Sequence, residues 1–323
     1  MTTNEERREA AKRKLEQRLE AERRLARRRR LMIASAAGVA VLAVVAVGAF
    51  FGWRAWDDSR RVQCTYDEAQ DPFKQLPAKL PDTVPADQRA QAQALLDYYK
   101  SVEKKQRSAP KPDDHPLKEG TVGLTFDTSV GAIPVTLNRA DGACNVNGVL
   151  SLAQSGYYDD VLCHAIAIGK NGGLTLCGDP TGTAGLPLVE GGNPGWNLPD
   201  ETPTNLKKYG QPNPLNPADQ PVMYPRGTVA VFNANTDGNP MLGQEGTSNT
   251  AGGALYFFLK DTAMSPKYAV IGKVDETGLK TLEKIEKGGI VPGPGNPETK
   301  PGEEVQSGKP KTDVEFTSVS VKE

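Results

Sequence analysis

Histidine and closely spaced cysteines are what this sequence most clearly lacks. It has two histidines and four cysteines, and no two cysteines stand in CxxC spacing, so a zinc site is not expected. An excess of charge of one sign is lacking too, because 39 Lys and Arg stand against 40 Asp and Glu, for a net charge of −1. Without a global basic field, binding to nucleic acid is not expected. The sequence predicts no metal and no cofactor.

Long uncharged runs are also scarce, and the one that exists extends from Leu31 to Trp53. In a helix it covers roughly 35 Å, compared with about 30 Å for the core of a bilayer. We therefore predict a single transmembrane helix over Leu31–Trp53. A cleaved signal peptide is the alternative, but its apolar region would be shorter and nearer the N-terminus. Four arginines, Arg27 to Arg30, precede the run, and the positive-inside rule places them in the cytoplasm and the later residues outside.

These features divide the chain into a basic cytoplasmic tail (1–30), the membrane helix (31–53), an extracytoplasmic spacer (54–118) and a main domain (119–323). The tail is a topology signal, or else it binds a cytoplasmic partner or anionic lipid. In the spacer Pro85 opens a predicted helix with one apolar face, formed by Ala92, Leu95, Leu96, Tyr99 and Val102. This face packs on the main domain or binds another protein.

All four cysteines follow the apolar run, and an even number in an oxidising compartment predicts two disulfides. Cys163 and Cys177 are centred on Lys170, in a glycine-rich turn signal, so a symmetric hairpin brings them face to face. That leaves Cys64 to pair with Cys144. The other two pairings of four cysteines, and buried free thiols, remain alternatives.

From Thr121 onward the pattern changes to short strands, beginning with a hairpin over 121–138. Two short helices are expected near 145–153 and 279–285. Further strand patterns occur at 161–168, 228–234, 255–259 and 268–274, with a last strand around Val314 and Phe316. The predicted fold class is mainly β, a closed β-barrel capped by two short helices.

A series of short motifs then follows in one order along about 170 residues. They are Ser151-Leu152-Ala153, Gly156-Tyr157-Tyr158-Asp159, Gly178-Asp179-Pro180-Thr181-Gly182-Thr183, Gly195-Trp196, Tyr224-Pro225-Arg226-Gly227-Thr228, Asn233-Ala234, Phe257-Phe258 and Lys267-Tyr268-Ala269-Val270-Ile271-Gly272-Lys273-Val274. Together they resemble a cyclophilin-type peptidyl-prolyl cis-trans isomerase of the membrane-anchored actinobacterial kind. The resemblance covers Thr121 to about Ile290 and the last strand.

The resemblance implies an arginine that hydrogen-bonds toward the prolyl nitrogen, but this sequence has Ala165 at that position. The family's glutamine before Gly-Gly-Asp-Pro is replaced by Leu176, and the glutamine before Phe-Phe by Tyr256. An aromatic floor position falls on Gly173, and the alanine before the asparagine becomes Phe232. The polar machinery of the family is therefore missing, and no catalytic residue is assigned with certainty.

The remaining groove positions implied by the resemblance are Asn233, Ala234, Phe258, Met264 and Tyr268. The sequence thus predicts a protein that binds proline-containing segments of exported proteins, with catalysis weak or lost. Two alternatives stay open: a fully active isomerase that assists the folding of secreted proteins, and a non-catalytic interaction module of the cell envelope.

Overall fold

The computed structural model describes residues 4–170, 172–186, 192–212, 216, 219–238, 245–292 and 305–322. The chain divides into two compact units, Met1–Arg60 and Arg61–Glu323. The first unit is mostly one helix, α1 (Asn4–Ser59).

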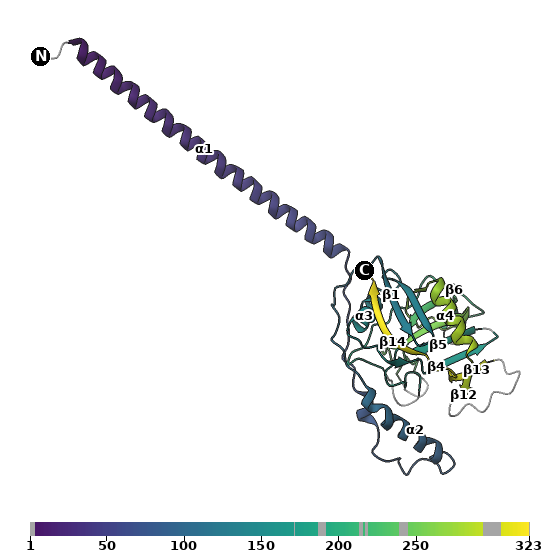
Figure 1. Cartoon of the computed structure of the whole chain (residues 1–323). Coiled ribbons are helices and arrows are strands. Elements are labelled where there is room, and N and C mark those ends of the chain that lie inside the picture. The colour runs from purple at the N-terminus through teal and green to yellow at the C-terminus, as the bar shows by residue number, and fades with distance from the viewer. Residues whose placement is uncertain are drawn as a thin grey trace. The chain divides into compact units, whose positions relative to one another are not determined.

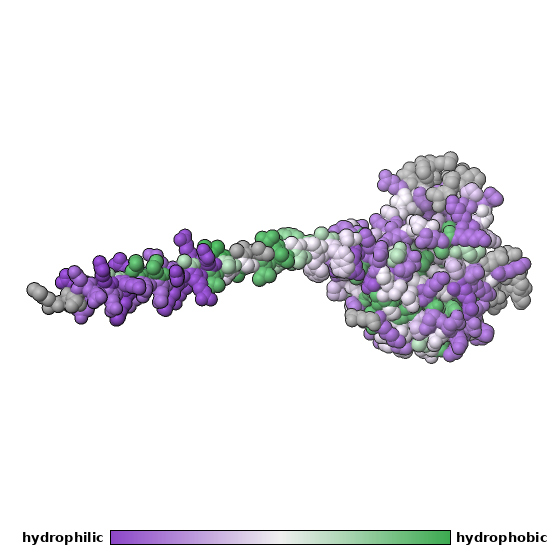
Figure 2. Space-filling view, turned by 90° about the horizontal axis from the view of Figure 1, so that it is seen from above, coloured by the Kyte–Doolittle hydropathy of each residue, from purple (hydrophilic) through white to green (hydrophobic). Residues whose placement is uncertain are grey.

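The apolar part of α1 follows its charged part along the chain, as the green and purple atoms of the helix show in Figure 2. Among the described residues, no helix combines the length and the apolar character that crossing a membrane requires. This finding contradicts the predicted transmembrane helix over Leu31–Trp53.

The second unit is built on an 11-stranded sheet with the order β12-β13-β4-β5-β9-β8-β11-β2-β1-β14-β3. A small second sheet has the order β10-β7-β6. The strands are β1 (Thr121–Thr128), β2 (Gly131–Asn138), β3 (Val161–Leu162), β4 (Ala165–Gly169), β5 (Gly172–Cys177), β6 (Lys207–Lys208), β7 (Val222–Tyr224), β8 (Thr228–Val231), β9 (Leu255–Lys260), β10 (Thr262–Met264), β11 (Val270–Val274), β12 (Ile290–Pro292), β13 (Val305–Pro310) and β14 (Glu315–Lys322).

The prediction of a closed barrel is wrong, because this sheet is curled but open. Within the described ranges, no pairing joins its two end strands, β12 and β3. These end strands have three and two residues, which is too short to offer each other a continuous ladder of hydrogen bonds.

Two helices pack on the sheet, α3 (Ala143–Gln154) against β14 and α4 (Glu276–Lys287) against β2 (Figure 1). The main apolar core lies between helices and sheet, where the rings of Phe126, Phe257 and Phe316 meet with centroids 4.8–6.0 Å apart. Trp196 is buried in the same core and donates its indole N–H to the carbonyl of Ala109 at 2.9 Å.

Residues 61–118, the spacer segment, belong to this second unit and run beside its loops. Arg61 forms a β-bridge with Leu117, and Glu68 forms one with Trp196. The segment contains α2 (Arg89–Val102) and two short 3₁₀ turns, Pro72–Gln75 and Glu103–Lys105.

The buried face of α2 packs mainly within the spacer segment itself. Tyr99 and Val102 form a small apolar cluster with Phe73. On the main domain, the described contact of α2 is the hydroxyl of Tyr98, which donates to the carbonyl of Gly182 at 3.1 Å. The predicted helix is thus present, but it begins at Arg89 rather than at Pro85, and its apolar face has a local partner.

Both predicted disulfides occur in the structure. Cys64 bonds to Cys144, which links the spacer segment to α3 with a Cα–Cα distance of 5.6 Å. Cys163 bonds to Cys177, which links the residue two before β4 to the last residue of β5. The hairpin pairs Gly169 with Gly172, so its centre lies half a residue beyond Lys170, the predicted centre. Cys163 and Cys177 are therefore not directly paired across the two strands.

The N-terminus of α3 is capped by a distant carboxylate rather than by its own N-cap residue, Gly142. Glu201 accepts the backbone N–H of Cys144 at 3.0 Å and that of Asn145 at 2.8 Å. These are two of the four N–H groups that a helix leaves without an internal partner, and the negative charge also suits the helix dipole.

We expect Glu201→Ala to lower the free energy of unfolding by about 1–2 kcal/mol, because both N–H groups lose their acceptor. Urea denaturation followed by near-ultraviolet circular dichroism measures this loss. Glu119→Ala, at an exposed position, is the control and should change little. Equal stability of the two variants would contradict the cap.

Candidate functional site

The register of four neighbouring strands brings several predicted site positions into one row. Ala165 of β4 pairs with Leu176 of β5, which pairs with Tyr256 of β9, which in turn pairs with Ala230 of β8. Directly paired residues in a sheet place their side chains on the same face. The row is apolar except for one phenol.

These residues belong to a second apolar cluster, separate from the main core, which we call the site cluster. Its buried members are Leu176, Ala184, Val222, Tyr224, Ala230, Ala254, Tyr256 and Phe258, and the half-buried residues packed against it are Ala165, Leu174, Leu206, Phe232, Met264, Tyr268 and Val270. The structure therefore brings together the predicted positions Ala165, Leu176, Phe232, Tyr256, Phe258, Met264 and Tyr268.

Gly173, the predicted floor position, lies at the start of β5 opposite Lys260 and outside the site cluster. Sequence reasoning missed Tyr224, although it stands in the Tyr-Pro-Arg-Gly motif. Its ring stacks on Phe258 with centroids 4.8 Å apart, and its hydroxyl lies 3.2 Å from the carbonyl oxygen of Tyr268. Tyr224 thus fixes the segment that carries Tyr268.

Three aromatic rings form the outer part of the site cluster. The rings of Phe232 and Tyr268 are nearly parallel, at 15°, with centroids 6.4 Å apart. Tyr256 stands perpendicular to both, at centroid distances of 5.5 Å and 5.0 Å. Leu176 is 3% exposed, Tyr256 9% and Phe258 0%, so the floor of the predicted groove is covered.

Burial also sets the protonation of this cluster. The loss of solvation raises the pKa of Tyr256 and of Tyr268 above the ordinary value of 10.0. The pKa of Tyr224 is raised in the same direction, also chiefly by burial. Each phenol is therefore neutral at physiological pH, and the site cluster offers neutral hydroxyl groups rather than an ionised acid or base.

Asn233 and Ala234 lie beside the site cluster, and their polar groups serve the backbone. The Asn233 side-chain amide donates to the carbonyl of Lys267 at 2.7 Å, and its oxygen accepts the N–H of Asn235 at 3.3 Å. The N–H of Ala234 donates to the hydroxyl of Thr250 at 2.8 Å. Asn233 thus anchors the segment before Tyr268 to the end of β8.

Among the described residues, no arginine belongs to the site cluster. Arg107 donates to the carbonyls of Tyr157 and Asp159, and Arg226 pairs with Glu283 at 2.7 Å. Arg89 donates to carbonyls of its own spacer segment. These three guanidinium groups are therefore engaged elsewhere.

The loop after β5 borders the site cluster and is organised by Asp179, which is 1% exposed. One carboxylate oxygen accepts the N–H and the hydroxyl of Thr181, and the other accepts the N–H groups of Thr183 and Ala184, all at 2.7–2.8 Å. On the same loop, the carbonyl of Ala184 lies 3.0 Å from Nε2 of His164, so this imidazole is engaged with the backbone of the loop.

We expect Asp179→Asn to destabilise the domain by about 2–3 kcal/mol, because an amide group then faces N–H donors that a carboxylate satisfied. Thermal unfolding with a matched Asp127→Asn control, at a half-buried position on β1, measures the difference. If the two variants unfold at the same temperature, the loop does not depend on this carboxylate.

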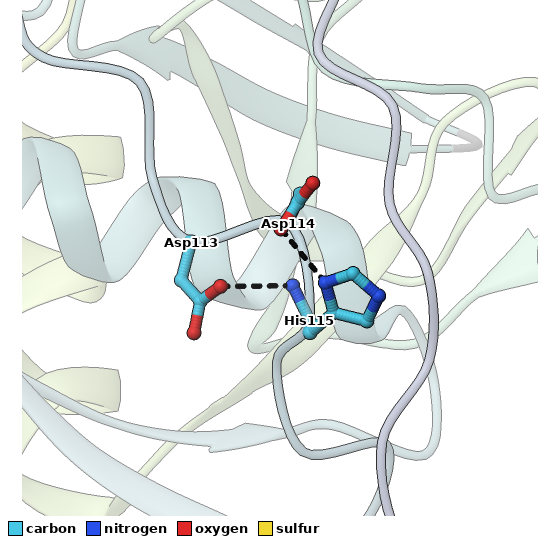
Figure 3. Close-up of side chains that lie close together, drawn as sticks. All are labelled: Asp113, Asp114 and His115. Carbon is cyan, nitrogen blue, oxygen red and sulfur yellow. Dashed lines mark hydrogen bonds and ion pairs between the residues drawn. The ribbon is translucent and has the colours of Figure 1, made fainter. Parts of the chain in front are cut away.

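One group of possible metal ligands exists among the described residues, formed by Asp113, Asp114 and His115 (Figure 3). All three are exposed, and Nδ1 of His115 lies 2.8 Å from Asp114, which lowers the pKa of that carboxyl chiefly through this hydrogen bond. Asp113 accepts the backbone N–H of His115 at 3.0 Å. The side chains are thus used within a surface turn, away from the site cluster.

Comparison with known proteins adds relatives for about half to two thirds of the chain. No family model matches. The chain is 33% identical over 185 residues to "Probable peptidyl-prolyl cis-trans isomerase B" of Mycobacterium leprae, covering 57% of this chain and 55% of that protein. It is 32% identical over 210 residues to the protein of the same name from Mycobacterium tuberculosis strain H37Rv, covering 65% and 58%. The chain thus spans less than three fifths of these relatives' length.

More distant similarity extends to eukaryotic proteins. "Peptidyl-prolyl cis-trans isomerase-like 1" of Emericella nidulans is 26% identical over 165 residues, covering 50% of this chain and 80% of that protein. A crystal structure of a cyclophilin type peptidyl-prolyl cis-trans isomerase from Cryptosporidium parvum aligns with a TM-score of 0.44 at 19% identity, covering 63% of this chain and 99% of that chain.

Proposed function

We propose that this chain, which is similar to two mycobacterial proteins named probable peptidyl-prolyl cis-trans isomerase B, binds X–Pro segments of exported proteins and isomerises them weakly or not at all. The site of this activity is the site cluster, where the sheet register collects Ala165, Leu176, Tyr256, Phe258 and Tyr268.

The proposal depends above all on the row Ala165–Leu176–Tyr256. Rotation about an X–Pro bond breaks no covalent bond, but it must cross a barrier of about 18–20 kcal/mol that amide resonance imposes. A protein lowers this barrier by holding the proline ring and by donating hydrogen bonds to the twisted amide. In this row the only polar side-chain group is one phenol. The row therefore supports binding of the proline ring, but it offers little to donate hydrogen bonds to the twisted amide.

The two disulfides support a place outside the cytoplasm. Cys64–Cys144 and Cys163–Cys177 are both buried in the domain, and protein disulfides persist in oxidising compartments. Proteins that pass through such a compartment are exported ones, and their X–Pro bonds are the clients that we propose.

A non-catalytic interaction module is the second candidate, and the covered floor of the site cluster favours it. Exchange NMR of a proline-containing peptide, recorded with the full chain, separates the two. Line broadening at peptide resonances without faster cis–trans exchange supports binding alone. Exchange that is faster than in free peptide supports a weak isomerase, and the absence of both effects would contradict the proposed function.

A further inference from the structure

The rings of Phe232 and Tyr268 stand on either side of Tyr256 in the site cluster. The plane of Phe232 lies at 15° to that of Tyr268 with a centroid distance of 6.4 Å, and Phe232 meets Tyr256 edge-on at a centroid distance of 5.5 Å. The three rings therefore form two walls and a floor. Whether a ligand can enter depends on the space between the walls.

That space is too narrow for a saturated ring. Carbon atoms in contact stand about 3.5–4.0 Å apart, so a proline ring between two aromatic walls requires wall planes at least about 7–8 Å apart. The centroids of Phe232 and Tyr268 are 6.4 Å apart. A prolyl group can reach Tyr256 from this side only after one wall has moved.

The loop residue Gly185 lies near the tip of the Phe232 ring. A Cβ placed on Gly185 would lie 3.8 Å from Cζ of Phe232 and 3.7 Å from a methyl carbon of Leu176. Gly185 has a φ of +79°, a conformation that favours glycine. The loop that Asp179 organises thus continues the cover over the floor of the site cluster.

The backbone at Phe232 is fixed while its side chain is half-buried. Its N–H donates to the carbonyl of Ala254 at 2.9 Å, and the N–H of Val231 donates to the carbonyl of Ala269 at 2.9 Å. Movement of this wall is therefore a rotation of the side chain, and removal of the ring opens the site without displacing the strand.

We infer that Phe232 is the residue that limits access to the site cluster, because its ring stands too close to that of Tyr268 for a proline ring to enter between them. The inference rests on the proposed function for the identity of the ligand. It adds that this one side chain weakens the binding of X–Pro segments, and that Tyr256 can accept proline once the Phe232 ring has moved.

The test is a peptide titration of the full chain and of Phe232→Ala, both labelled with ¹³C at the methionine methyl groups. Met264 packs against the site cluster and reports binding there, while Met32 of α1 is an internal reference. The probe is acetyl-Ala-Ala-Pro-Ala-amide, with acetyl-Ala-Ala-Ala-Ala-amide as the control peptide. We expect Phe232→Ala to bind the proline peptide at least tenfold more tightly than the unmodified chain, with no gain for the control peptide.

Val319→Ala is the control, because Val319 of β14 is half-buried but packs against the main core, outside the site cluster. It should leave the affinity unchanged. If Phe232→Ala does not fold, Phe232→Leu tests the same point, with a severalfold gain expected. Failure of the folded variant to gain affinity would overturn the inference. Absence of binding by the unmodified chain, with binding by Phe232→Ala, would contradict the proposed function and leave the inference standing.

Discussion

The full chain should isomerise a short X–Pro peptide at least about a hundredfold more slowly than a cyclophilin that has the family arginine. A hydrogen bond that strengthens in the twisted state acts like an oxyanion-hole donor, and loss of one such donor costs about 10²–10³ in rate. Ala165 stands at the arginine position, and its neighbours in the row are Leu176 and Tyr256. A protease-coupled assay, or exchange NMR, measures the rate.

Ala165→Arg alone should recover little activity, because a single guanidinium beside Leu176 has no polar partner to orient it. We expect the triple variant Ala165→Arg, Leu176→Gln, Tyr256→Gln to recover more than tenfold over the unmodified chain. Ala167→Arg is the matched control, since Ala167 lies two residues further along β4 on the same face and pairs with Leu174. Near-typical turnover by the unmodified chain would show that another group performs the role of the arginine, and the fully active isomerase would become the leading alternative.

Much of the site could be predicted from local sequence patterns. Motif order assigned Leu176 and Tyr256 to groove positions, and the strand pairing then places the two opposite each other. The covered state of the site could not be predicted in this way. It depends on ring contacts between Phe232 and residues distant in the sequence, Tyr256 and Tyr268.

The closure of the sheet was mispredicted for the same reason, because it depends on contacts between residues distant in the sequence. Whether the sheet closes depends on its end strands, β3 and β12, and strands of two or three residues carry almost no signal of their own. Pro134 lies in β2, which is inside the sheet, although proline in strands is usual at edges and bulges. The proline is tolerated because the pairing of β2 with β11 begins one residue later, at Val135.

The apolar run of α1 shows another limit of sequence reasoning. Its length and its flanking arginines predict a membrane helix, whereas the structure contains none of sufficient apolar character among the described residues.

The second large effect is expected at the disulfides, which should differ in how much they stabilise the domain. Cys64–Cys144 spans 80 residues and Cys163–Cys177 spans 14. The chain-entropy relation for cross-links gives about 4.5 kcal/mol for the longer loop and about 3 kcal/mol for the shorter one. We therefore expect the pair Cys64→Ala, Cys144→Ala to lose more stability than Cys163→Ala, Cys177→Ala.

Loss of each disulfide should also loosen a different part of the domain. Near Cys64 the spacer segment keeps few other links to α3, among them the hydroxyl of Tyr66, which donates to the carbonyl of Cys144 at 3.0 Å and accepts from the Asn147 amide at 3.0 Å. Limited proteolysis should therefore cut within residues 61–118 of the Cys64→Ala, Cys144→Ala chain. The Cys163→Ala, Cys177→Ala chain keeps the link from Cys64 to α3 and should resist cleavage there. Urea denaturation of the two variants gives their free energies of unfolding. A greater loss of stability in the Cys163→Ala, Cys177→Ala chain would contradict the entropic account, because the shorter loop would then contribute more than the longer one.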